Sequence, residues 1–69
     1  MGVKEVVAQA LGVDPAWITR DTGPGTFPQW DSLGHLNVIL AFEKAFNRTL
    51  TVMEQMEIES VADLEELLC

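Results

Sequence analysis

The chain has 69 residues, enough for one small domain with a thin hydrophobic core. Hydrophobic residues make up 48% of it and charged residues 22%, a balance too apolar for intrinsic disorder. The net charge is -7 and is uneven: residues 1–30 carry two basic and three acidic side chains, and residues 31–69 carry two basic and eight acidic ones. Such an acidic half repels phosphate backbones, so we expect basic protein surfaces rather than nucleic acid as partners.

Cysteine content and hydropathy indicate the compartment. A single cysteine, Cys69, cannot form an internal disulfide, and we interpret it as an incidental exposed thiol. The sequence has no apolar run of about 18 residues for a membrane span and no signal-peptide pattern. We therefore expect a soluble, cytoplasmic monomer with no membrane span.

The first third of the chain predicts one helix and one helical turn. Apolar residues recur at helical spacing over 3–11, and Gly12 is a typical helix end. Asp14 followed by Pro15 predicts a short helical turn, from which Trp17 and Ile18 are expected to enter the core.

Residues 19–30 are long for a connection and rich in glycine and proline. Neither Pro24 nor Pro28 supplies a backbone donor, and each favours extended structure in the residue before it. Phe27 and Trp30 predict that this loop packs onto the helices.

The remaining residues predict three further helices. Residues 33–46 form the longest apolar run, so wide that neighbours should cover the helix on several sides, and Asn47 is a suitable end. Thr51 and Glu54 form a capping box that starts a short helix, and Ser60 with Asp63 resembles a second box before a last apolar face. Two methionines of the short helix are interpreted as core filler rather than as a binding surface: Met53 and Met56.

The predicted fold is all-α: a small four-helix bundle with three principal helices, one short helix and a long loop between the first two. Residues 1–69 form a single domain. No internal repeat or low-complexity tract interrupts it.

Ser32 follows the loop at the start of the longest predicted helix. The first N–H groups of a helix are unpaired and its dipole is positive there, which favours a bound or attached phosphate. From the residues alone, two interpretations of Ser32 stay open: a helix cap, or the attachment point of a phosphate-linked group. Asp31 likewise either caps the helix or assists chemistry at the serine.

Asp31-Ser32-Leu33, together with the length, the acidity and the order of helices, resembles the attachment motif of acyl carrier proteins. The resemblance implies an all-α acyl-carrier-type bundle in which Ser32 carries covalent 4'-phosphopantetheine from coenzyme A, with Asp31 and Leu33 beside it. It also implies that the protein is not an enzyme but the substrate of a phosphopantetheinyl transferase. Acyl- or aminoacyl-activating and transferring enzymes would be its other partners, in fatty acid or polyketide biosynthesis. Trp30 would either pack against the bundle or shield the first atoms of the cofactor.

Partner recognition is expected around Ser32, at residues of the second and third helices: Gly34, His35, Asn37, Val38, Glu54 and Glu57. The second helix departs from the pattern of carriers in fatty acid synthesis, because it has Gly34 after Leu33 and only one acid further on, Glu43, which Lys44 follows. The departure favours a specialised pathway, with a polyketide, an aminoacyl group or a cell-surface modification as cargo. The Gly-Gly-X-Ser motif of peptidyl carriers is absent.

Two other function classes compete with the carrier. Asp31, Ser32 and His35 share a helix face and imitate a hydrolase set, but no second loop offers an oxyanion hole. Two ligands of mixed type also leave a metal site incomplete. The stronger alternative is a small helical protein–protein interaction domain without a prosthetic group.

Overall fold

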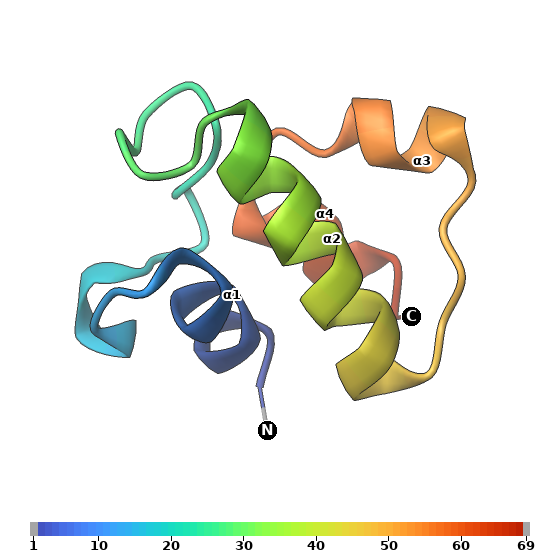
Figure 1. The fold of residues 1–69 in the computed structure, drawn as a ribbon, viewed down its shortest axis with the longest axis horizontal. Helices are drawn as coiled ribbons and strands as arrows, with labels where there is room; N and C mark the ends of the chain where they lie inside the picture. The colour runs from blue at the N-terminus through green and yellow to red at the C-terminus, as the bar shows by residue number, and fades with distance from the viewer. Residues whose placement is uncertain (1, 69) are drawn as a thin grey trace.

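The computed structural model describes residues 2–68, and Cys69, expected to be an exposed thiol, lies outside them. Its elements in chain order are α1 (Val3–Leu11), the 3-10 turn η1 (Pro15–Trp17), α2 (Ser32–Phe46), α3 (Val52–Glu57) and α4 (Val61–Glu66) (Figure 1). The all-α prediction is confirmed for the described residues. However, α4, expected to be a principal helix, is as short as α3. Within residues 2–68, no helix has the length and apolar character needed to cross a membrane.

Local capping chemistry fixes most of these boundaries. α1 ends at Gly12 and α2 at Asn47, both in the left-handed conformation, with φ of 71° and 52°. The Asp14 carboxylate accepts a hydrogen bond from Ala16 N at 2.9 Å and starts η1. Thr51 and Glu54 form the expected reciprocal box at the start of α3. These four predictions are confirmed.

The start of α4 differs from the prediction, because the Ser60 side chain makes no capping hydrogen bond. The backbone carbonyls of the long loop take its place: Val61 N donates to Thr22 O at 2.9 Å, and Ala62 N donates to Arg20 O at 3.0 Å. Two orphan donors of the helix are thereby satisfied by a distant segment. The same bonds fasten the loop to α4.

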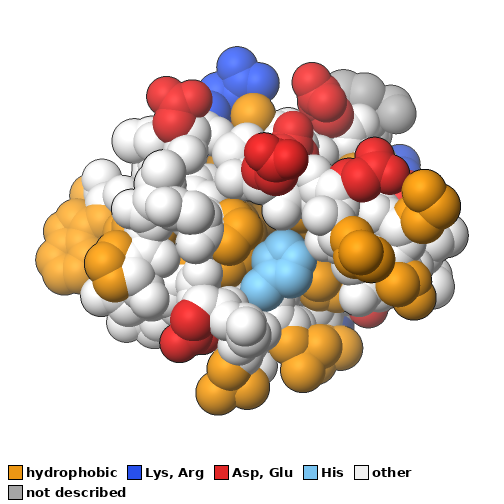
Figure 2. Space-filling view, turned by 90° about the horizontal axis from the view of Figure 1, so that it is seen from above, with side chains coloured by type: hydrophobic (Ala, Val, Ile, Leu, Met, Phe, Trp, Pro, Cys, Tyr) orange, Lys and Arg blue, Asp and Glu red, His pale blue; other side chains and the backbone are white. Residues whose placement is uncertain are grey.

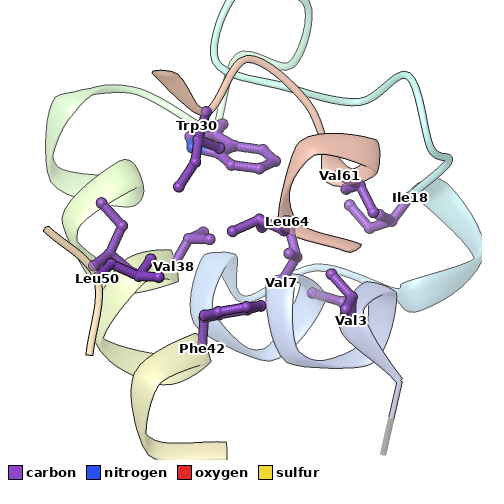
Figure 3. Close-up of a cluster of buried hydrophobic side chains, with 12 residues drawn as sticks. Val3, Val7, Ile18, Trp30, Val38, Phe42, Leu50, Val61 and Leu64 are labelled. Atoms are coloured by element: carbon purple, nitrogen blue, oxygen red, sulfur yellow. The ribbon is translucent and has the colours of Figure 1, made fainter. Parts of the chain in front are cut away.

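The core lies around α1, which packs against α2 on one side and contacts α4 as well. Figure 3 shows side chains from these helices converging with Trp30, which enters from the loop and is fully buried. Phe27 packs partly buried against the cluster, so the prediction that the loop packs on the bundle is confirmed. The prediction that Trp17 enters the core is wrong, because 62% of this residue is exposed, whereas Ile18 is buried as expected. The chain leaves the 3-10 turn in an extended conformation at Ile18, so the two neighbouring side chains do not share a direction.

Gly23 provides a direct test of how the loop is fastened to α4. A Cβ atom there would lie 1.9 Å from Glu59 O, whereas one on Gly25, in the same loop, meets nothing within 4 Å. We expect Gly23→Ala to lower the free energy of unfolding by about 1–3 kcal/mol through overpacking, and Gly25→Ala to leave it nearly unchanged. Urea unfolding of both variants checks this, and equal stabilities would contradict the described fit.

Candidate functional site

The start of α2 is capped by Asp31, not by Ser32. Asp31 has an extended backbone, and its Oδ1 accepts a hydrogen bond from Gly34 N at 2.8 Å. Ser32 is therefore the first residue of the helix proper, and its side chain is exposed. Among the described residues, its hydroxyl has no hydrogen-bond partner. Of the two interpretations of Ser32, the helix cap is therefore wrong, because Asp31, one residue earlier, caps the helix.

Two backbone donors beside the hydroxyl also remain unpaired. The N–H groups of Ser32 and Leu33 have no acceptor within residues 2–68, because the cap satisfies the N–H of Gly34 instead. Together with the positive end of the dipole of the 15-residue helix, these donors suit an anion attached to the serine.

Gly34 lets the loop lie directly against α2. A Cβ atom there would be 2.5 Å from Gln29 O and 2.9 Å from Leu11 Cδ2. The residue is buried, and so is Val38 on the same side of the helix. Both were expected in a partner-facing surface, and this placement is wrong because their positions serve the packing of α2.

A short hydrogen-bonded chain crosses the site behind Ser32. The indole Nε1–H of Trp30 donates to His35 Nδ1 at 2.9 Å, and His35 Nε2 lies 2.9 Å from Gln55 O on α3. The two rings are stacked at 29°, with centroids 6.1 Å apart. Of the two roles left open for Trp30, packing against the bundle is what the structure shows.

A groove of about 640 Å³ runs between α2 and α3 and reaches the serine. His35, the only histidine of the chain and the pale-blue side chain of Figure 2, lies in the face that carries this groove, with hydrophobic side chains bordering it. The residues that line the groove are Pro24, Trp30, Asp31, Ser32, His35, Leu36, Ile39, Val52, Gln55, Met56 and Ile58.

Large apolar side chains are exposed on both sides of the groove. On α2 they are Leu33, 68% exposed, with Leu36 and Leu40, so the expectation that neighbours cover this helix on several sides is wrong. On α3 they are Val52, Met53 and Met56, the last 77% exposed.

The interpretation of the methionines as core filler is likewise wrong. α3 has no buried residue of its own, and the chain is anchored by buried Leu50 before the helix and buried Ile58 after it. The anchors hold α3 at its ends, so its apolar side chains stay outside the core.

The other residues expected at a partner surface differ in their availability. Asn37 and Glu57 are exposed. Glu54 is half-buried and engaged with Thr51 N at 2.9 Å. Within the described part of the chain, no group of three or more metal-ligating side chains is placed to hold an ion.

Leu36 and Gln55 are groove residues that the sequence analysis did not single out. Leu36 could have been recognised from the sequence, because it follows Leu33 at helical spacing and so lies on the same face of the helix. Gln55 takes part through its backbone carbonyl, which no residue type reveals.

Comparison with known protein families finds no family model that matches this chain.

The two neighbouring side chains Asp31 and Ser32 should contribute very differently to stability. We expect Asp31→Ala to lower the free energy of unfolding by about 1 kcal/mol, because it removes the cap of α2. Ser32→Ala should change it by less than about 0.5 kcal/mol, because the hydroxyl bonds to nothing in the described structure. Chemical denaturation of the two variants distinguishes them, and a larger loss for Ser32→Ala would show that the serine is structural.

Proposed function

We propose that the protein is a carrier that bears 4'-phosphopantetheine on Ser32 and moves thioester-linked acyl or aminoacyl groups between partner enzymes. The observation that carries this proposal is the state of the Ser32 hydroxyl, which is exposed and unbonded at the head of α2 while Asp31 does the capping. A serine that only stabilises a helix start normally uses its side-chain oxygen to accept the capping hydrogen bond. Here the oxygen is available to a visiting enzyme.

The surroundings of the serine suit the linker of this cofactor. A phosphodiester carries a negative charge, and the unpaired N–H groups of Ser32 and Leu33 lie beside the attachment oxygen. Negative charge is favourable in the first turn of a helix, near its N-terminus. The carboxylate of the preceding residue, Asp31, is occupied in capping, because its Oδ1 accepts the hydrogen bond of Gly34 N and leaves the N–H groups of Ser32 and Leu33 unpaired.

The groove next to Ser32 suits what the arm would carry. Its lining includes Leu36, Ile39, Val52, Met56 and Ile58, and it opens to the surface beside the serine. An apolar acyl chain gains free energy by leaving water for such a lining. Met56 is a flexible side chain that adapts to cargo of different shapes.

The chemistry requires little of the carrier itself. In the transferase, Ser32 Oγ attacks the β-phosphate of coenzyme A and forms the phosphodiester, while adenosine 3',5'-bisphosphate leaves and the hydroxyl proton passes to a base of the transferase. The thiol at the end of the arm then accepts an acyl group as a thioester. Tethering gives successive enzymes a substrate at high effective concentration. We place this activity in a specialised pathway, because the exposed side chains around Ser32 include Leu33, Leu36 and Met56 rather than a row of acids.

His35 argues against the competing hydrolase. A general base for Ser32 needs a free ring nitrogen, and the two nitrogens of His35 are engaged with Trp30 and Gln55. Taking a proton from the serine would first require one of those bonds to break. The interaction domain remains the second candidate, because the exposed Leu33 and Met56 would serve it equally well.

Intact mass measurement tests the proposal. Incubated with coenzyme A, Mg²⁺ and a broad-specificity phosphopantetheinyl transferase, the protein should gain the mass of one phosphopantetheine group. Ser32→Ala should gain none. Ser60→Ala is the matched control, because Ser60 is the only other serine of the chain, and it should be modified like the wild type. An unmodified wild type, with the transferase active on another carrier, would favour the interaction domain.

Leu33 should contribute to recognition by the transferase. It follows the serine directly and is largely exposed, so a docked enzyme would bury it. We expect Leu33→Ala to lower kcat/KM of modification by roughly tenfold, the effect of losing an apolar contact at an interface. Trp17→Ala is the control, because Trp17 is similarly exposed, at 62%, but lies on η1 and not beside Ser32, so its modification rate should not change. Equal effects of the two variants would refute a docking role for Leu33.

A further inference from the structure

The hydrogen bonds of His35 determine which of its nitrogens carries the proton. An indole Nε1–H can only donate, so Nδ1 of His35, 2.9 Å away, must accept and carry no proton. The neutral ring therefore has its proton on Nε2, where it donates to Gln55 O at 2.9 Å. The ring joins a fully buried tryptophan on one side to α3 on the other.

This arrangement tolerates one charge state of the ring. A second proton on Nδ1 would point at the indole N–H, placing two donors face to face at a distance suited to a hydrogen bond. Trp30 is fully buried and has no exposed route to another acceptor. The ring must turn away instead, and because an imidazole is rigid, turning removes Nε2 from Gln55 O as well.

α3 depends on that second bond. Within residues 2–68, His35 to Gln55 is the only hydrogen bond between α2 and α3 themselves, while Glu43 on α2 accepts from Leu50 N, just before α3, at 2.8 Å. α3 itself has no fully buried residue. We propose that His35 is a proton-operated latch on the groove: the neutral ring closes it by joining Trp30 to α3, and the doubly protonated ring opens it. Trp30, His35 and Gln55 all line the groove, so release changes its wall.

The charged surroundings of His35 are simple. Just before its own helix, the cap residue Asp31 lines the same groove, four residues earlier, with Oδ1 accepting from Gly34 N. From the loop, Trp30 contributes no charge. The carboxylates of α3, Glu54 and Glu57, line a separate hollow against α4. Apart from His35 itself, Asp31 is thus the only residue with an ionisable side chain in the groove lining.

Attachment of the cofactor would act on the latch, and this step rests on the proposed function. A phosphodiester on Ser32 adds negative charge three residues before His35, on the same helix face. Negative charge favours the doubly protonated ring. Modification should therefore shift the latch toward its open state, which couples the loading of the arm to the shape of the groove.

Nuclear magnetic resonance on the unmodified protein tests the latch without relying on the cofactor. At about pH 7.5, the ring ¹⁵N shifts should show His35 protonated on Nε2 alone. At about pH 5.5, the exchange protection of the Trp30 indole N–H, corrected for its intrinsic rate, should fall by roughly fivefold or more. The backbone amides of α3 should lose protection with it, while those of α1 should not.

His35→Asn is the matched variant. Its side-chain oxygen occupies about the place of Nδ1 and does not titrate, so Trp30 protection should become independent of pH. A proton on Nδ1 at about pH 7.5, or unchanged Trp30 protection in the wild type on acidification, would overturn the latch, whether or not the variant folds. In the phosphopantetheinylated protein the loss of protection should occur at higher pH. Failure of the transferase to modify Ser32 would remove the carrier proposal and leave the test of the latch intact.

Discussion

The hydrogen bond from Gly34 N to Asp31 Oδ1 is the contact on which the site depends. At 2.8 Å it fixes the first turn of α2 and assigns the capping role to the residue before Ser32. The donor could be any residue with a backbone N–H, but a side chain at this position would collide with Gln29 O, so the position requires glycine. One residue therefore satisfies the cap and admits the loop, and the serine between cap and donor is left with an exposed, unbonded oxygen.

The two halves of the groove are held with very different firmness. Ser32 stands on a 15-residue helix whose inner face, including Val38 and Phe42, is fully buried. α3, set apart from the other helices in Figure 1, is anchored at its two ends by Leu50 and Ile58 and in its middle by the bond from His35. Ser32 thus stands on the helix that the core holds, whereas the opposite wall of the groove is fastened by few contacts. Under the proposed function, such a division keeps the serine in place for each enzyme while the wall adapts to cargo.

Local signals predicted much of the fold, and contacts distant in sequence explain what they missed. Gly12, Asn47 and the box of Thr51 with Glu54 act within one turn of chain, so their chemistry could be recognised in the sequence. The cap of α4 could not, because its acceptors are carbonyls of Arg20 and Thr22, about forty residues away, and every residue type has a carbonyl.

The same contrast holds for the site. Ser32 and Asp31 could be selected from a local motif, although which of them caps the helix depends on backbone geometry. Helical periodicity placed apolar residues on α2 correctly but gave no information on how much of that helix its neighbours cover. Because α3 is only six residues long, the exposed side of α2 keeps Leu33, Leu36 and Leu40. How much of a helix is exposed depends on the length and position of its neighbours, which the sequence of that helix alone does not show.

Histidine suits position 35 for a reason that joins these observations. The position needs an acceptor toward Trp30 and a donor toward Gln55 O, on opposite sides of one side chain. A carboxylate accepts on both sides and an ammonium group donates on both, so neither meets the requirement. An amide side chain offers one of each, but its two groups diverge from a single carbon and do not span the same gap. Only the neutral imidazole combines both functions at this separation, and it is also the side chain whose charge changes near neutral pH.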